Sequence, residues 1–368
     1  MKKKGIAPRA RAAIGCLPAQ RFMRLCTQVV LFLLLLASVG LRAQQPAAPA
    51  QTPAMPLPAE DRDPVRAPDG ETHAAEIVKQ ADGDLVLRTE VEEVVLNVTV
   101  LDGTKIVQDL KKENFRVAED GVAQKILSFQ HTDLPVSIAL VVDNSGSMGK
   151  KRPSVNKSTL DLIAASNPAD EAFVVNFSDE AFIDQDFTSD PEKLRKGLSN
   201  IDARGGTALY DAVVASADKL ATDGKRPKQV LILITDGEDN ISTLTLEQTI
   251  RRVQELGGPV IYSIGLLFGD DMSRSEIKHA RRALELLSTE TGGMAYFPKS
   301  IEQVDEIAAA VARDIRSQYT IGYHSSKPSS DTGFRHVQVA VEGKGLRKLT
   351  VRTRTGYFPG GRIARKTR

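Results

Sequence analysis

Five oxygen-bearing side chains stand where apolar segments of the sequence end or where helical patterns begin. Three of them follow the apolar run 136–142 with the spacing Asp-x-Ser-x-Ser, one follows the pair Gly205-Gly206, and one follows the apolar run 230–234. Carboxylate and hydroxyl oxygens, with no histidine or cysteine among them, favour a hard cation such as Mg²⁺, Mn²⁺ or Ca²⁺ over zinc. The five residues are Asp143, Ser145, Ser147, Thr207 and Asp236.

The segments around these residues alternate between strand and helix patterns from residue 135 to residue 317. Nearly continuous apolar runs at 136–142, 230–234 and 260–264 predict parallel strands that are buried on both faces. Helical periodicity separates the strands, at residues 209–220, 246–256 and 301–315. The alternation predicts an α/β fold with a doubly wound, mostly parallel sheet. Such sheets bind ligands beyond the carboxyl ends of their strands, where the five residues lie.

The three loops together resemble the metal-ion-dependent adhesion site of von Willebrand factor A domains, with all five family positions filled. The resemblance covers residues 135–317, about half of the chain, and the whole layout resembles bacterial exported proteins of the A-domain type. It implies a Rossmann-like fold in which Ser145, Ser147 and Thr207 contact the metal, while Asp143 and Asp236 act directly or through water. It also implies Mg²⁺ as the expected ion, with Mn²⁺ or Ca²⁺ as alternatives, and a protein partner that offers an Asp or Glu carboxylate.

Other interpretations of these loops fit the sequence less well. An EF-hand loop that starts at Asp143 would have Met148 in place of its glycine and Ser154 in place of its last glutamate. A phosphate-binding loop fails on the spacing of its glycines. A metal-assisted hydrolase needs a general base near the metal, and only Glu238 and Asp239 follow the loops closely enough to serve. We therefore expect no enzymatic activity.

Two features of the loops also have a purely structural interpretation. Asp143 and Thr207 could simply cap helices, although capping would not explain all five residues together. The cluster Lys150-Lys151-Arg152 directly follows the first loop. It could steer an acidic ligand towards the site, or it could be a solvated loop.

The N-terminal segment 1–43 has the pattern of a secretory signal peptide. Basic residues precede a short apolar run, and small residues follow it up to Ala43. An uncleaved anchor is the alternative, but the apolar run is shorter than the roughly 18 to 20 residues that span a membrane. Translation could also start at Met23. Both cysteines, Cys16 and Cys26, lie in this segment, so the exported chain would contain no disulfide.

The rest of the chain divides into a linker and two β-rich stretches. Seven prolines fall between Pro46 and Pro68, which predicts a solvated linker over residues 44–83. Alternating apolar and polar residues with Asp-Gly turns predict strands in 84–134 and in 318–358. Neither stretch has enough strands to cover its own apolar face, so we expect the two to pair into one small β-sandwich-like domain. Residues 359–368 form a basic tail.

The charge composition argues against nucleic-acid binding. The chain has 49 basic and 47 acidic residues, but eight of the basic ones lie in the first 43 residues, which hold no acidic residue; the remainder therefore carries a net charge of −6. This charge gives no electrostatic reason to bind nucleic acid.

We expect an exported, divalent-metal-dependent protein-binding module in the periplasm, on the cell surface or secreted, with no membrane span after cleavage. The alternative is a non-catalytic scaffold subunit of a cell-envelope complex, with a structural metal.

Overall fold

The computed structural model describes residues 93–268, 272–328, 330–343 and 348–360. All of them belong to one compact unit of the chain, Ala59–Arg368. The predicted signal peptide (1–43), the linker (44–83), the beginning of the first β-rich stretch (84–92) and most of the basic tail (361–368) lie outside the described residues.

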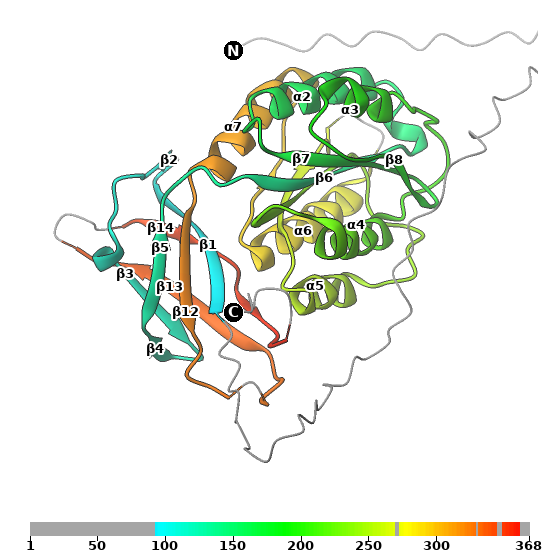
Figure 1. Ribbon diagram of the computed structural model, residues 1–368. Coiled ribbons are helices and arrows are strands. Elements are labelled where there is room, and N and C mark those ends of the chain that lie inside the picture. Colours follow the sequence, from blue (N-terminus) through cyan, green and yellow to red (C-terminus); the bar gives the residue numbers. More distant parts are fainter. Residues whose placement is uncertain (1–92, 269–271, 329, 344–347, 361–368) are drawn as a thin grey trace, which may run out of the picture. The chain divides into compact units, whose positions relative to one another are not determined.

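A six-stranded, mostly parallel sheet forms the centre of residues 136–316 (Figure 1). Its strand order is β11-β10-β9-β6-β7-β8, and only the pair β7 and β8 is antiparallel. The strands are β6 (Val136–Asp143), β7 (Glu171–Phe177), β8 (Ala181–Thr188), β9 (Lys228–Thr235), β10 (Val260–Gly265) and β11 (Ala295–Tyr296). The prediction of a doubly wound α/β sheet is confirmed, and the apolar runs that supported it are β6, β9 and β10.

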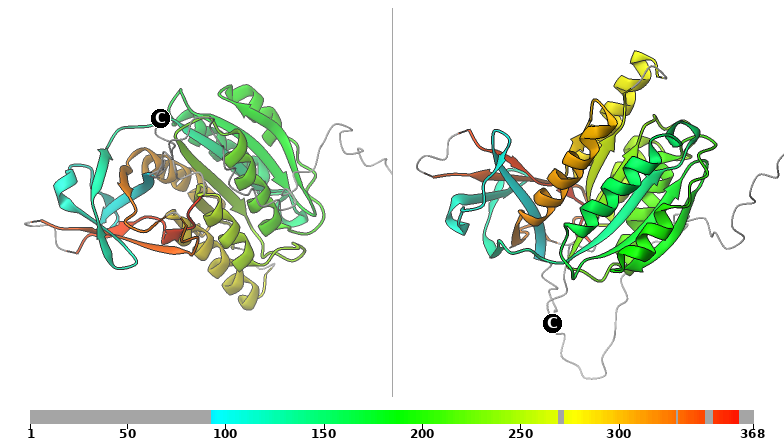
Figure 2. Two further views of the ribbon diagram at one scale, coloured as in Figure 1. Left: turned by 60° about the horizontal axis from the view of Figure 1, so that its bottom comes forward. Right: turned by 90° about the horizontal axis from the view of Figure 1, so that it is seen from above.

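Helices cover both faces of this sheet, as the two views in Figure 2 show. Alternate residues of each strand point to opposite faces. One core therefore joins Ile138 and Leu140 of β6 to α2, α3 and α7, and the other joins Ala139 and Val141 to α4, α5 and α6. The helices are α2 (Arg152–Ala164), α3 (Pro191–Leu198), α4 (Leu209–Asp223), α5 (Leu246–Glu255), α6 (Arg274–Thr291) and α7 (Val304–Arg316).

The strands before β6 and after α7 form two antiparallel sheets, which we call the β-domain (residues 93–130 and 319–357). One sheet has the order β14-β1-β12-β5 with β2 on β1, and the other has the order β15-β13-β3-β4. Each sheet therefore combines strands from both ends of the described chain. The strands are β1 (Glu93–Asp102), β2 (Lys105–Ile106), β3 (Phe115–Glu119), β4 (Val122–Gln124), β5 (Ile126–Gln130), β12 (Tyr319–His324), β13 (Arg335–Val341), β14 (Thr350–Arg352) and β15 (Gly356–Tyr357).

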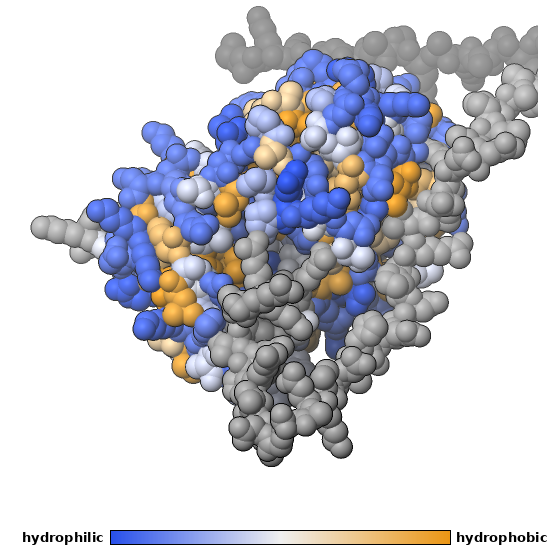
Figure 3. All heavy atoms as spheres, in the orientation of Figure 1, coloured by the Kyte–Doolittle hydropathy of each residue, from blue (hydrophilic) through white to orange (hydrophobic). Residues whose placement is uncertain are grey.

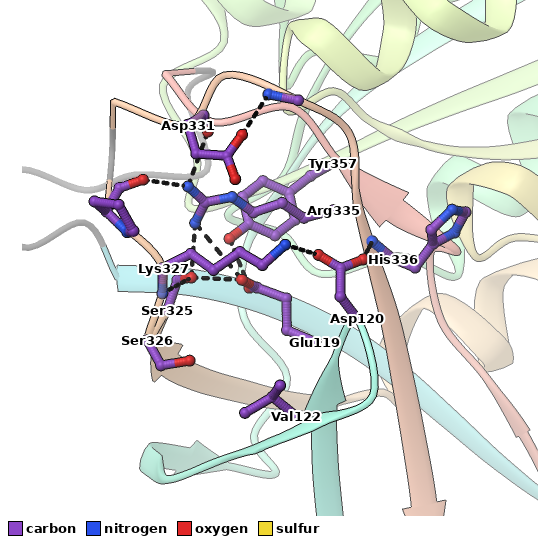
Figure 4. Close-up of polar contacts among 12 residues, drawn as sticks. Glu119, Asp120, Val122, Ser325, Ser326, Lys327, Asp331, Arg335, His336 and Tyr357 are labelled. Atoms are coloured by element: carbon purple, nitrogen blue, oxygen red, sulfur yellow. Dashed lines mark hydrogen bonds and ion pairs between the residues drawn. The ribbon is translucent and has the colours of Figure 1, made fainter.

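A buried carboxylate, Glu119, joins the two sheets of the β-domain, and Figure 4 shows it beside Arg335 and Tyr357. Glu119, at the end of β3, is 1% exposed and accepts hydrogen bonds from the hydroxyls of Tyr323 and Tyr357, both at 2.8 Å. The guanidinium of Arg335 lies 3.6 Å away and balances its charge. Burial and the hydrogen bond to Glu119 raise the pKa of Tyr357 to about 12, although Arg335 opposes the shift. The arrangement balances a buried charge where strands of the two sheets meet.

Hydrophobic side chains gather on the surface of the β-domain in the region of β3 to β5 (Figure 3). Val122 of β4 is 53% exposed and Leu127 of β5 is 42% exposed.

The end of α7 is tied to the β-domain by buried polar groups. Asp314 accepts a hydrogen bond of 2.9 Å from the hydroxyl of Thr99 in β1 and forms an ion pair with Arg352 of β14.

The end of α7 is also bonded to the central sheet, where the ammonium of Lys228 in β9 donates to the carbonyl of Ile315. Burial lowers the pKa of Lys228 to about 8, against the opposing field of nearby carboxylates.

Candidate metal centre

Three loops meet at the carboxyl-terminal edge of the central sheet. The first loop follows β6 and leads through the short helix η2 (Gly146–Met148) into α2; the second precedes α4; the third follows β9. β6 and β9 are adjacent and parallel, with Val142 paired to Ile234, so both end at the same place. The structure therefore brings the five predicted residues into one neighbourhood.

Asp143 lies at the base of this site and is fully buried. Its Oδ1 accepts the backbone N–H of Ser145 at 2.8 Å, and its Oδ2 accepts the hydroxyl of Thr235 at 2.5 Å. Burial raises the pKa of this carboxyl to about 6, although both hydrogen bonds oppose the shift. Protein donors thus bond to both oxygens of Asp143, and these hydrogen bonds hold the first loop in place.

Asp236 and the hydroxyl side chains of Ser147 and Thr207 form the polar floor of a cleft. The Ser147 hydroxyl donates to Oδ1 of Asp236 at 2.7 Å, and the hydroxyls of Ser145 and Ser147 lie 3.3 Å apart. Ser147, Thr207 and Asp236 all line the cleft. This set of neutral hydroxyls around a carboxylate fits a hard cation.

A cationic group already stands beside Asp236. The ammonium of Lys151 lies 2.6 Å from Oδ2 of Asp236, whose side chain has no exposed surface. The position next to this carboxylate therefore accommodates positive charge, which supports the fit of the site to a metal ion.

The second loop is held in place by side chains of its neighbours. The backbone N–H of Gly206 donates to Asp179 at 2.6 Å, and the N–H of Thr207 donates to Oδ1 of Asn240 at 2.9 Å. Gly205 has a φ of 78°, and a Cβ there would collide with the Asp179 carboxylate. The Gly-Gly pair is thus required for the tight approach that presents Thr207 to the cleft.

Arg152 anchors the first loop from below. It is fully buried, and its guanidinium donates to the carbonyl of Asp143 at 3.0 Å, to Oδ1 of Asn176 at 2.8 Å and to the carbonyl of Leu198 at 2.9 Å. The interpretation of the basic cluster as a solvated loop is therefore wrong for Lys151 and Arg152, because both reach inward to buried acceptors. Lys150 is exposed as that interpretation expects.

The cleft has a volume of about 260 Å³ and combines the polar floor with an apolar wall and an acidic rim. The apolar wall consists of Leu267, Phe268, Met272 and Ile277. The acidic rim consists of Glu238, Asp239 and Glu276. The cleft thus offers both polar and apolar contacts beside the candidate cation position.

The two acidic residues that could serve as a general base have other partners. Asp239 accepts hydrogen bonds from the N–H of Tyr210 at 3.1 Å and from the hydroxyl of Ser242 at 2.5 Å. Glu238 lies 3.4 Å from Nδ1 of His279 on α6. Both contacts connect the third loop to neighbouring helices.

The sequence analysis named Lys151 and Arg152 only as part of the basic cluster 150–152, without the contacts that they make in this site. It did not single out Asp179 and Asn240, which hold the second loop. Within the described residues, no group of three or more histidine, cysteine or acidic side chains is arranged to hold a metal. The candidate centre therefore depends on hydroxyls as much as on carboxylates.

Across the same described ranges, no helix has both the length and the apolar character needed to cross a membrane.

The central part of the chain matches a known protein family. Residues 138–238 match the sequence pattern of the family described as the von Willebrand factor type A domain. No curated protein matches the chain.

Several solved structures resemble part of the chain. The vWF domain of the type V pili tip protein Mfa5 from Porphyromonas gingivalis is 16% identical over 50% of this chain and 97% of its own, with a TM-score of 0.40. A von Willebrand factor type A structure from Catenulispora acidiphila is 14% identical over 75% of this chain and 76% of its own, with a TM-score of 0.42. An aerotolerance-related membrane protein from Bacteroides fragilis is 16% identical over 49% of this chain and 98% of its own, with a TM-score of 0.40. Similarities of this size say nothing about a shared partner or activity.

Proposed function

Since this chain contains a von Willebrand factor type A domain, we propose that it is a protein-binding module that depends on a divalent cation. Ser145, Ser147 and Thr207 would hold the cation directly, and Asp143 and Asp236 would do so directly or through water. Mg²⁺ is the expected ion, and Mn²⁺ and Ca²⁺ suit the same oxygen donors.

The observation that carries this proposal is the arrangement around Asp236. Its carboxylate is buried, receives the Ser147 hydroxyl at 2.7 Å, and shares an open cleft with Thr207. A bound cation would supply a Lewis-acidic coordination position to a carboxylate of the partner. Few charged ligands surround that position, which strengthens its attraction for an anionic group. The partner would therefore be a protein that presents an Asp or Glu side chain.

We propose no catalytic role for the chain. A metal-assisted hydrolase would need a free general base beside the cation. The candidates Glu238 and Asp239 lie on the rim, where they contact His279, Tyr210 and Ser242. These contacts support a structural role for both carboxylates. Export to the periplasm, the cell surface or the medium belongs to the same proposal and rests on the sequence pattern of residues 1–43.

A second candidate function is a non-catalytic scaffold subunit of a cell-envelope complex, in which the metal stabilises the fold. The exposed apolar residues Val122 and Leu127 of the β-domain favour it, because they provide a second surface for a partner. The two functions differ in what metal removal does. The module loses binding, whereas the scaffold loses stability and still binds through the β-domain.

Thermal unfolding of the purified protein with EDTA, Mg²⁺, Mn²⁺ or Ca²⁺ tests the metal site. A cation at 100 times its dissociation constant adds about 2.7 kcal/mol to the free energy of unfolding, which raises the melting temperature measurably. Thr207→Val is the sharpest variant, because it removes a hydroxyl ligand and keeps the shape of the side chain. Asp143→Ala is the second variant. A shift in the parent that both variants lose supports the site, and the absence of a shift with every metal refutes it.

A further inference from the structure

Lys151 places its ammonium group inside the candidate metal centre. It precedes α2, and its side chain is only 19% exposed because it extends across the cleft to Oδ2 of Asp236 at 2.6 Å. The ammonium also lies 5.5 Å from the centre of the Phe268 ring on the apolar wall. A flexible surface lysine would not be confined in this way, so Lys151 is part of the site.

The burial of Asp236 explains why a cation is needed there. The Asp236 side chain has no exposed surface, and the Ser147 hydroxyl, a neutral donor, is bonded to Oδ1. A buried carboxylate is costly unless a positive charge or several donors compensate it. Asp143 lies close by and adds negative charge. Either the ammonium of Lys151 or a metal ion can therefore balance Asp236.

The two cations exclude each other at this position. A divalent ion bound to Asp236, Ser147 and Thr207 would lie within a few ångströms of the present ammonium position, where like charges repel strongly in a poorly solvated site. The four-carbon stem of a lysine lets its ammonium leave, since no second anionic partner holds it among the contacts of the described residues. Metal binding must then break the Lys151–Asp236 ion pair.

We propose that Lys151 is an internal counter-cation of the metal centre, which a divalent ion has to displace. Lys151 thereby sets the metal affinity of the site and keeps the metal-free domain folded by neutralising Asp236. This inference rests on the proposed function, because it concerns the same site. In this proposal, one residue outside the Asp-x-Ser-x-Ser motif controls when the site binds a divalent ion.

The chain offers a matched control in the preceding residue. Lys150 carries the same charge one position away, but it is exposed on the surface. Lys150→Gln and Lys151→Gln therefore change the net charge equally, and only the second removes the charge from Asp236. Lys151→Gln keeps a hydrogen-bond donor for Asp236, so it preserves folding better than Lys151→Met, which keeps the stem alone.

The test is a calorimetric titration of Mn²⁺ into the full chain and its variants, with the melting temperature in EDTA as a second measurement. We expect Lys151→Gln to bind Mn²⁺ about tenfold more tightly than the parent and Lys150→Gln to bind as the parent does. In EDTA, Lys151→Met should melt at a lower temperature than the parent, and saturating Mn²⁺ should remove most of the difference.

The outcomes separate this inference from the proposed function. If the parent binds Mn²⁺ and Lys151→Gln binds it equally or more weakly, the displacement idea is wrong and the metal site stands. If only Lys151→Gln binds, Mn²⁺ cannot displace the ammonium in the parent; this outcome supports Lys151 as the counter-cation of Asp236 but refutes displacement and metal dependence of the parent. If neither binds, both proposals fail. If Lys150→Gln gains as much Mn²⁺ affinity as Lys151→Gln, the gain reflects only the lower net charge, and the proposed role of Lys151 is wrong.

Discussion

Replacing Arg152 by methionine should destabilise the protein and loosen the metal-binding loop. Methionine keeps an unbranched stem but offers no donor, so three buried acceptors lose the guanidinium: the carbonyls of Asp143 and Leu198 and the side chain of Asn176. Each buried acceptor that is left without a partner costs about 1–3 kcal/mol, so we expect a loss of about 3–5 kcal/mol in total. The carbonyl of Leu198 keeps a second donor, the amide of Asn156 at 2.6 Å, which favours the lower end of that range.

Urea unfolding of the parent and of Arg152→Met measures this loss directly. Arg152→Lys separates charge from geometry, because it keeps the positive charge but cannot form the same fork of hydrogen bonds. It should lose less free energy of unfolding than Arg152→Met. Lys150→Met is the control for loss of a neighbouring exposed charge, and it should change stability by no more than about 0.5 kcal/mol.

The loss should also extend to the metal centre. Arg152 holds the carbonyl of Asp143, from which the first loop begins, so Arg152→Met should reduce the stabilisation by Mg²⁺ or Mn²⁺ at a fixed metal concentration. If the free energy of unfolding of Arg152→Met lies within about 0.5 kcal/mol of the parent's, the network contributes no net stability and our reasoning is refuted. If its stability falls but its metal affinity stays the same, the arginine supports the fold alone.

Three further changes test other parts of the structure. Lys228→Met should raise the free energy of unfolding by about 3 kcal/mol at pH 7. The folded-state pKa of Lys228, about 8, lies below the ordinary 10.5, so the parent bears the full cost of the buried charge below pH 8. That advantage should shrink as the pH rises from 8 towards 10, and an advantage independent of pH in urea titrations would contradict the assignment. Gly205→Ala should cost about 1–2 kcal/mol in thermal unfolding, because its Cβ would strike Asp179; Gly103→Ala, with a φ of 60° and open space, controls for the backbone conformation and should cost less. Glu119→Gln should destabilise the protein by about 2–3 kcal/mol in urea unfolding, since it removes the charge that faces a buried guanidinium, and an unchanged midpoint would show that the ion pair contributes nothing.

The central sheet could be predicted because its strands are apolar without interruption. β6, β9 and β10 are buried over almost their whole length, and such runs are typical of parallel strands with helices on both faces. Helix α2 could not be predicted in the same way. It buries Arg152, Ser158 and Thr159, so polar residues lie on its inner face and interrupt the helical periodicity of its hydrophobic residues.

The candidate site was predictable in its residue types but not in its contacts. The loops after β6 and β9 had to meet because parallel neighbours end at one edge, and this placed Asp143 near Asp236. The ion pair between Lys151 and Asp236 joins residues 85 positions apart, and no local pattern indicates it. The register of β1 on β12 likewise joins residues more than 200 positions apart, and turn chemistry does not fix it.

The way in which the chain enters and leaves the α/β domain has a mechanical consequence. The chain enters after β5 and returns in β12, and these two strands are antiparallel neighbours with Gln130 opposite Thr320. A pulling force applied at the metal centre, at the far edge of the central sheet, would reach the β-domain through both strands at once and in the same direction. Two neighbouring strands loaded together cannot be unzipped from each other, so the load falls on the ladders that hold the pair, including the six residue pairs between β12 and β1. Such a tether resists tension along its strands better than a single connecting segment would.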